Sequence, residues 1–480
     1  MTALPDLNSC SYMTILKLQR TARATVAALT VTVAAVACNT DEVLSVQDPD
    51  VVRPGALGDS TSLAVWLSSA YSEVLAGYDG GTFEGIVNFS GLFSDEFIQT
   101  ESFPTRFEVD TRNMLVGNTS LRDVFRELSR GRASAERAAR KFVEFEKEND
   151  IGHAEVLNLA GFAYILFGEN YCSGVPFSTL NDDQSITYGD PQTTQGMFES
   201  AIAKFDSART IAGALTGAKP TAQVNLARIG RGRALLNLAR FADAATAVTG
   251  VPADFKFELQ HSDNSARQNN GVWSLSINGG RWGVSEKEGT NGLPFRTASD
   301  VRVASRPRSL NSGNGFDGGP MFEALKYPAR TTAITLADGV EAELIKAEAQ
   351  LRAGDAAGFL ATLNTLRANS AVLTTRGYPA GALASLADPG TEVGRQNLLF
   401  RERAYWLFLT AHRIGDMRRL IRQYGRPTET VFPTGPYSSN GRTTIYGTDT
   451  SFPIPVEELN NPNVQQDPPP NLKGCLNRDP

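Results

Sequence analysis

The sequence predicts a mostly α-helical protein, built as a scaffold of helical pairs with long Gly- and Asn-rich loop insertions and a few short strands. In several long segments of the 480-residue chain, apolar residues recur at steps of three and four, a spacing that places them on one face of a helix. The 43 glycines and 24 prolines indicate long structured loops between the helices. The chain is long enough to bury a large core.

The N-terminus has the parts of a bacterial export signal. Lys17, Arg20 and Arg23 precede an apolar run at 24–37 that ends in small residues, and this run is too short to span a bilayer comfortably. It closes on "AVAC", which resembles a lipobox, so we expect Cys38 to be lipidated.

The mature protein would then begin at Cys38 and stay on the membrane through its lipid. Residues 1–37 would form the signal peptide, with Met13 as the expected true start. The stretch 38–59 reads as an extended leader, because its prolines disfavour helix.

The remainder, 60–480, is expected to form one domain. Helical patterns occupy about 60–250 and 338–423, and a long tail follows at 424–480. The expected helices are 60–77, 119–149, 153–171, 195–213 and 222–248, with a further pair at 342–368 and a helix at 401–422.

Two of these segments resemble tetratricopeptide helix–turn–helix units. In 222–248, small residues precede "LARFADAA" and a break is expected near Ala239–Phe241. In 342–368, the turn is expected at "AGD". The units are far apart and irregular, so the sequence predicts a helical scaffold with insertions and not a regular solenoid.

The segment 251–337 differs in composition and is expected to carry the ligand-facing loops. It is rich in Gly, Asn, Ser and Arg, and "NSGNGFDGG" at 311–319 reads as a cluster of turns. The stretches 271–277 and 281–285 are expected to pair as a β-hairpin. A loop region this long is usually functional.

Aromatic residues beside glycines in these loops are candidates for stacking on sugar rings, whose C–H faces are apolar. Packing under the loops is an equally good explanation for any one ring. The ligand-binding candidates are Trp282, ahead of Trp273, and, in "YDGGTFEG", Tyr78 and Phe83.

No catalytic residue, metal site or cofactor is expected. His412 has no nucleophilic serine or cysteine in a motif such as G-x-S-x-G, and the three histidines are isolated in sequence. The charges of 401–422 are interpreted as a buried network, with Arg413 and Asp416 close enough on a helix to pair. The net charge of −6 gives no sign of the excess of basic residues that is typical of nucleic-acid-binding proteins.

Two cysteines remain after the lipidated one. Cys172 follows a helix, and Cys475 lies in the proline-rich tail. An even pair of thiols in an exported protein tends to be bridged, so we expect a Cys172–Cys475 disulfide, with two independent cysteines as the alternative.

The C-terminal segment 451–468, "SFPIPVEELNNPNVQQDP", resembles the closing signature of the SusD/RagB family, the lipoproteins of outer-membrane nutrient-uptake systems. The matching residues are Phe452, Pro453, Ile454, Pro455, Glu458, Asn461, Pro462, Asn463, Gln466 and Pro468. The segment 401–422 is similar to a family helix through Glu402, Arg403, His412, Arg413, Asp416, Arg418 and Arg419.

The resemblance implies a non-enzymatic binder, lipid-anchored to the outer membrane and facing the exterior. It would capture oligosaccharides, or sometimes peptides, for a TonB-dependent SusC-like transporter. Thr410–Ala411 and Trp406 depart from the family's usual residues, which puts the ligand class in question more than the fold. Two alternatives stay open: a tetratricopeptide-type scaffold that assembles envelope proteins, and a lipid-anchored glycan hydrolase.

Overall fold

The computed structural model describes residues 57–82, 85–183, 185–439, 441–464 and 474–477. The chain divides into two units, Met1–Gly58 and Asp59–Pro480. The elements described below belong to the second unit. The predicted signal peptide, Cys38 and nearly all of the leader lie outside the described residues.

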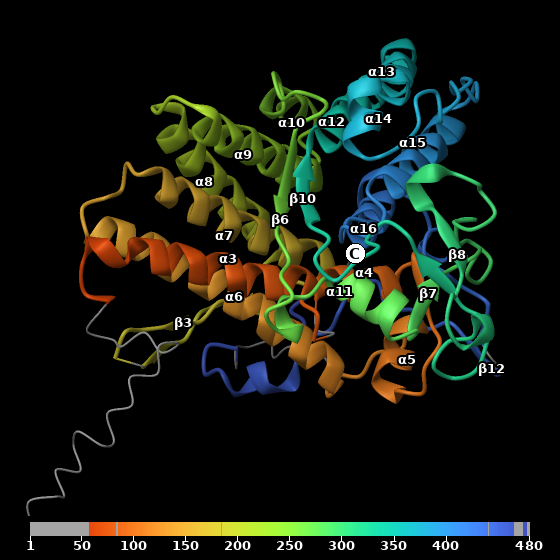
Figure 1. Ribbon diagram of the computed structural model, residues 1–480, viewed down its shortest axis with the longest axis horizontal. Helices are drawn as coiled ribbons and strands as arrows, with labels where there is room; N and C mark the ends of the chain where they lie inside the picture. The colour runs from red at the N-terminus through yellow and green to blue at the C-terminus, as the bar shows by residue number, and fades with distance from the viewer. Residues whose placement is uncertain (1–56, 83–84, 184, 440, 465–473, 478–480) are drawn as a thin grey trace, which may run out of the picture. The chain divides into compact units, whose positions relative to one another are not determined.

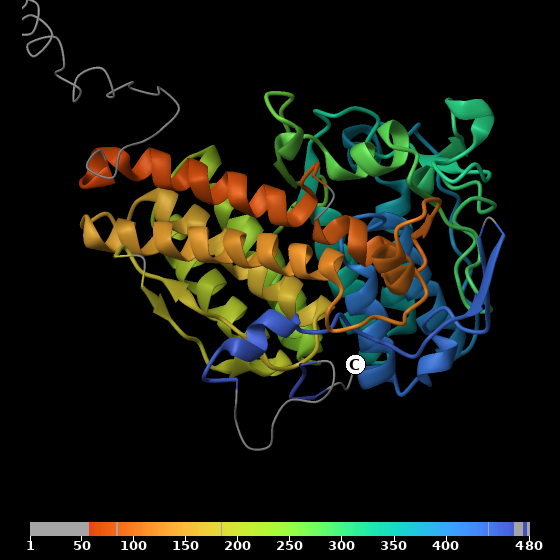
Figure 2. The ribbon, with the colours of Figure 1, turned by 90° about the horizontal axis from the view of Figure 1, so that it is seen from below.

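Long helices form one side of this unit, where Figures 1 and 2 show them side by side at the left. They pack in sequence order, α3 on α6, α6 on α7, α7 on α8 and α8 on α9. Their bounds are α3 Leu63–Asp79, α6 Thr119–Glu144, α7 Ile151–Asn170, α8 Thr194–Gly213 and α9 Ala218–Asn237. Each overlaps a segment in which the apolar spacing predicts a helix, and the predicted fold class is confirmed.

Helix α7 is the centre of this group. It is long and apolar enough to cross a membrane, but 94% of its apolar window is buried inside the protein. A helix that is apolar on all sides belongs in a core when neighbours cover it. Asp150 caps its N-terminus by accepting a hydrogen bond from the Gly152 N–H.

The two tetratricopeptide-like units are present. Helix α9 turns at Ala239, whose φ is 57°, into α10, Phe241–Ala247. The second unit pairs α12, Gly339–Arg352, with α13, Ala356–Ala368. Its turn requires glycine at Gly354, where φ is +79°. The breaks lie where the sequence places them.

Between α10 and α12 the chain forms short strands and turns in place of long helices. Strands β6 and β10 pair in the centre of the view in Figure 1, and β1 pairs with β7. The two-stranded sheets are β6 Lys256–Leu259 with β10 Ile334–Asp338, β1 Phe97–Gln99 with β7 Trp282–Val284, β8 Ser305–Pro307 with β9 Phe322–Ala324, β11 Pro436–Ser439 with β12 Arg442–Ile445, β2 Val175–Pro176 with β5 Pro191–Gln192, and β3 Thr179–Leu180 with β4 Ile186–Thr187.

The hairpin predicted for 271–285 is wrong. Residues Gly271–Trp273 (α11) and Ser274–Asn278 form helical turns, and the side chain of Asn270 accepts a hydrogen bond from the Trp273 N–H to start them. A short apolar run does not by itself distinguish a strand from a buried helical turn. The second half of the expected hairpin is a strand, β7, but its partner is β1.

The segment 401–422 is two helices and not one. Helix α15, Glu392–Trp406, ends in a break, and α16, Arg413–Tyr424, begins after it. Within the break, Leu409 and Ala411 have φ of 51° and 58°, which a continuous helix does not allow. The buried carboxylate of Glu96 accepts a hydrogen bond of 3.0 Å from the Leu409 N–H and supports the break.

The charges of this segment form the buried network that the sequence predicts, with different partners. Arg413 pairs with Asp95, at 2.7 Å, and not with Asp416. Asp416 pairs with Arg403 at 2.7 Å and with Arg419 at 2.8 Å, and these guanidinium groups lower the pKa of its carboxyl against the effect of burial. Arg413 and Asp416 both lie on α16, but each pairs with a different group, Arg413 with Asp95 and Asp416 with the two arginines.

Shorter helices complete the unit. Helix α4 is fully buried, and α5 begins directly after Phe103 with a proline at its first position, where proline is well tolerated. Their bounds are α4 Ile86–Phe93, α5 Pro104–Asp110 and α14 Ser370–Thr375.

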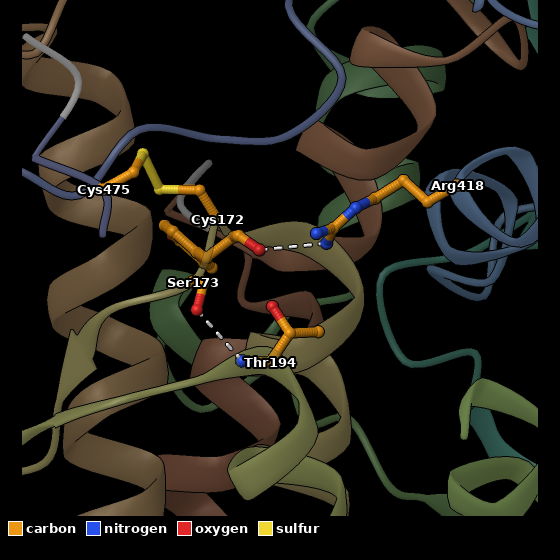
Figure 3. Close-up of a disulfide and its surroundings, with 6 residues drawn as sticks. Cys172, Ser173, Thr194, Arg418 and Cys475 are labelled. Carbon is orange, nitrogen blue, oxygen red and sulfur yellow. Dashed lines mark hydrogen bonds between the residues drawn. A yellow bond between two sulfur atoms is a disulfide. The ribbon is translucent and has the colours of Figure 1, made fainter. Parts of the chain in front are cut away.

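The C-terminal tail is joined to the end of α7. Cys172 and Cys475 form a disulfide with a Cα–Cα distance of 5.7 Å, the pair that the sequence analysis expects. Figure 3 shows Arg418 of α16 directed at the same place. Its Nη1 donates hydrogen bonds of 2.9 Å to the carbonyls of Gly168, Glu169 and Tyr171. The carbonyls at the C-terminus of α7 are therefore capped by a side chain.

Candidate ligand-binding face

Trp282 does not offer its ring to a ligand in this structure, which corrects the first of the sequence candidates. The side chain is fully buried, and its ring centroid lies 5.1 Å from that of Phe89 in an edge-to-face contact. Its Nε1–H donates a hydrogen bond of 2.7 Å to Glu101. The pairing of β7 with β1 places this side chain in the core.

Of the other sequence candidates, one is fully buried, one is partly buried and one lies outside the described residues. Tyr78 is fully buried, and its hydroxyl donates to the carbonyls of Thr335 at 3.0 Å and Thr410 at 3.1 Å, so its place in a ligand surface is also corrected. Trp273 is partly buried, with the guanidinium of Arg330 6.0 Å from its ring. Phe83 lies outside the described residues.

The buried carboxylate of Glu101 organises the surface next to Trp282. It follows β1, is fully buried, and accepts hydrogen bonds from the side chains of Arg106 at 2.7 Å and Arg281 at 2.8 Å, besides Trp282. Charge-assisted hydrogen bonds of this kind are strong and directional. One buried carboxylate thus fixes two arginines and one tryptophan.

Two exposed phenyl rings lie against these arginines, and Arg281 is close to both rings. Phe103 is 46% exposed and Phe316 is 55% exposed. The Arg281 guanidinium carbon lies 4.3 Å from the Phe316 ring centroid and 5.5 Å from that of Phe103, and the Arg106 carbon lies 4.7 Å from the Phe103 centroid. We call the four side chains of Phe103, Arg106, Arg281 and Phe316 the aromatic platform.

The turn cluster at 311–319 places Phe316 on this platform. The Phe316 N–H donates to the Gly280 carbonyl at 2.6 Å, and the next N–H, of Asp317, donates to the Thr100 carbonyl at 2.9 Å. Gly315 has no room for a side chain, because a Cβ there would lie 2.4 Å from the Thr100 hydroxyl. The loop is therefore docked against the segment that carries Glu101.

The platform has the chemistry of a surface for polar ring-shaped ligands. Exposed phenyl faces pack against apolar C–H groups, and guanidinium N–H groups donate to hydroxyls. A cavity of about 270 Å³ lies in the same part of the fold, and its lining includes Thr100, Gly283, Phe322 and Ser439. Stacking of Arg281 on Phe316 also holds the ring in place.

Sequence reasoning missed Phe103 and Phe316, although Phe316 lies inside the quoted "NSGNGFDGG". The signal in the sequence was a single aromatic residue among turn residues. Such a cluster forms no core, so a ring within it is expected to be exposed. Among the described residues, no group of three or more His, Cys, Asp or Glu side chains could hold a metal ion.

Comparison with known protein structures shows which fold the chain has. No family model and no curated protein matches the chain. A SusD superfamily protein from Bacteroides fragilis superposes with a TM-score of 0.59 at 15% identity, over 84% of this chain and 97% of that one. The chain has the SusD-like fold.

Two further SusD-like structures support this. A SusD superfamily protein from Bacteroides vulgatus gives a TM-score of 0.56 at 15% identity, over 85% of this chain and 98% of that one. A laminarin-binding SusD-like protein gives 0.58 at 14% identity, over 84% and 98%. The predicted resemblance to SusD-like proteins is confirmed at the level of the fold. The superposition covers 97–98% of each of these SusD-like chains.

Proposed function

We propose that this protein is an outer-membrane lipoprotein that faces the cell exterior and captures nutrient oligomers, chiefly oligosaccharides. It would pass them to a TonB-dependent SusC-like transporter without cleaving them. The SusD-like fold over 84–85% of the chain is the observation that carries the proposal. One of the similar structures is described as laminarin-binding and others as carbohydrate-binding.

The aromatic platform supports the choice of oligosaccharides over peptides. Its rings can stack on successive sugar rings, and its guanidinium groups can donate hydrogen bonds to hydroxyls without needing a charged ligand. Glu101 holds the arginines in fixed positions before any ligand binds, so little conformational entropy is lost on binding.

The lipidation expected at Cys38 from the sequence supports the proposed location. A leader of about 20 residues between Cys38 and Asp59 can separate the folded unit from the membrane by several tens of ångströms when it is extended. Changing Cys38→Ala should release the protein from membranes and abolish incorporation of labelled fatty acid. Unchanged membrane retention in that variant would contradict the anchor.

A glycan-binding screen tests the function itself. The full chain, purified in detergent from the outer membrane, is titrated with neutral polysaccharides that include laminarin, and the products are examined for new reducing ends. We expect saturable binding of at least one glycan with no hydrolysis. Hydrolysis would favour the glycan hydrolase, and binding of no glycan or peptide, together with stable capture of other envelope proteins, would favour the scaffold.

A further inference from the structure

A second cavity, of about 160 Å³, lies between the β6–β10 ribbon and the break that separates α15 from α16. None of the four platform side chains lines it. Its volume corresponds to about five water molecules, which leaves room for one small polar group. The lining includes Lys326, Glu341, Arg376, Trp406 and His412.

Each carboxylate in the lining has a cationic or titratable partner. Asp338 pairs with Arg376, and Glu258 pairs with Lys256 at 2.6 Å. Glu341 lies 3.1 Å from the Nε2 of His412 and 3.9 Å from the guanidinium of Arg233. The negative charges around the cavity are therefore already balanced.

The positive charge of Lys326 is the one that lacks a counterion. Its Nζ donates a hydrogen bond to the Phe408 carbonyl, but within the described parts of the chain no carboxylate lies within 4.0 Å of it. Burial lowers its pKa to about 8. A buried ammonium without a counterion is unfavourable, and an anion in the cavity would relieve this.

Two further polar groups in the lining lack hydrogen-bond partners among the described residues. The Nε1–H of Trp406 is buried without an acceptor, and the Oε2 of Glu341 is buried without a donor, whereas its Oε1 is the atom that lies 3.1 Å from His412. Trp406 is 5% exposed and Glu341 is 1% exposed. Buried polar groups in native proteins are usually satisfied, so the cavity offers both a donor and an acceptor to whatever occupies it.

We propose that this cavity is a binding site for the carboxylate of an acidic sugar, a hexuronate or the terminal residue of an acidic oligosaccharide. The carboxylate would accept hydrogen bonds from Lys326 and from the indole of Trp406, and a sugar hydroxyl would donate to Glu341. The site is separate from the aromatic platform, and its test is independent of the test of the proposed capture of neutral oligosaccharides.

Calorimetric titration of the full chain at pH 7 tests the site, with glucuronate as the probe and glucuronamide and glucose as uncharged controls. We expect glucuronate to bind at least about tenfold more tightly than either control, because a charge-assisted hydrogen bond contributes about that factor or more. Its binding should weaken as the pH rises above 8. Equal binding of glucuronate and glucuronamide, or no heat with glucuronate at about 10 mM, overturns the proposal. These measurements use the unmodified protein, so they do not depend on a variant that folds.

Variants locate the interaction. Lys326→Met should reduce glucuronate affinity at least about tenfold, whereas Lys346→Met, which removes a lysine outside the lining of this cavity that pairs with Glu343 at 2.6 Å, should change it less than about threefold. Trp406→Phe should weaken binding several-fold. Equal losses in Lys326→Met and Lys346→Met would contradict the assignment of Lys326. If an oligogalacturonate binds more tightly than galacturonate, the carboxylate comes from the end of an oligomer. If galacturonate binds more tightly, the carboxylate comes from a free sugar acid.

Discussion

The indole of Trp282 and the carboxylate of Glu101 are joined by a hydrogen bond of 2.7 Å inside the core. Replacing Trp282→Phe removes the donor and leaves a buried carboxylate oxygen with one partner fewer. We expect this change to lower the free energy of unfolding by about 1–3 kcal/mol. Urea denaturation at pH 7 measures it.

The Trp282→Phe variant also distinguishes a structural role of Trp282 from a role in ligand contact. If the ring belongs to the core, Trp282→Phe lowers stability while glycan affinity per folded molecule stays within about twofold. A variant with unchanged stability and strongly reduced glycan binding would show that Trp282 reaches the ligand, against the buried position described above.

Phe316 is expected to contact the ligand. Changing Phe316→Ala removes one stacking surface, worth on the order of 1 kcal/mol, and should weaken the tightest ligand of the glycan screen several-fold. Because the ring is 55% exposed, the melting temperature should hardly change. Leu310→Ala, an equally exposed apolar side chain at 54%, serves as the control, and equal effects of the two variants would refute a specific role for the ring.

Glu96 should make stability depend on pH. Burial raises the pKa of its carboxyl from 4.5 to about 8 in the folded protein, so the folded state binds a proton that the unfolded state has lost. Its contribution is fully present below pH 4.5 and is lost as the pH rises through 8. Glu96→Gln keeps an oxygen that can accept from the Leu409 N–H, and it cannot ionise.

The variant should therefore gain stability relative to the wild type between pH 5 and pH 9. Chemical denaturation at a series of pH values gives the difference between the two proteins, which removes the contribution of other titrating groups. Glu148→Gln, at an exposed position, should show no such trend. A wild-type-to-Gln difference that stays constant over this range would mean that Glu96 does not carry the proton.

The disulfide is expected to stabilise the fold and to form in the cell. Cys172 and Cys475 are 303 residues apart, and closing so long a loop is worth about 6 kcal/mol in the unfolded-chain model, although measured values are often lower. A Cys172→Ser/Cys475→Ser variant should unfold at lower urea concentration. In a non-reduced digest of protein from the cell envelope, mass spectrometry should find the linked peptide, and two freely alkylatable thiols would contradict it.

The local parts of the fold could be predicted from the sequence because their signals are local. The turn at Gly354 and the cap formed by Asp355 lie within the few residues that define the α12–α13 pair. The same holds for α7, whose N-terminal cap is Asp150. In these places apolar spacing and capping residues agree with the packing.

The non-local parts could not be predicted in this way. The partner of Trp282 across the β1–β7 pair is Gln99, far away in the sequence, and the indole's acceptor comes two residues later at Glu101. Arg413 likewise pairs with Asp95 and not with a neighbour on its own helix. The prediction for Trp282 is wrong because burial of a loop tryptophan depends on which distant strand covers it.

The central claim is capture for a transporter, and affinity purification of the tagged protein from detergent-solubilised outer membranes tests it most directly. The proposed function predicts that quantitative mass spectrometry finds one large TonB-dependent barrel in roughly equal amount to this chain, and that glycan binding survives in the complex. Recovery of the chain without such a barrel, from membranes in which a SusC-like protein is present, would contradict it.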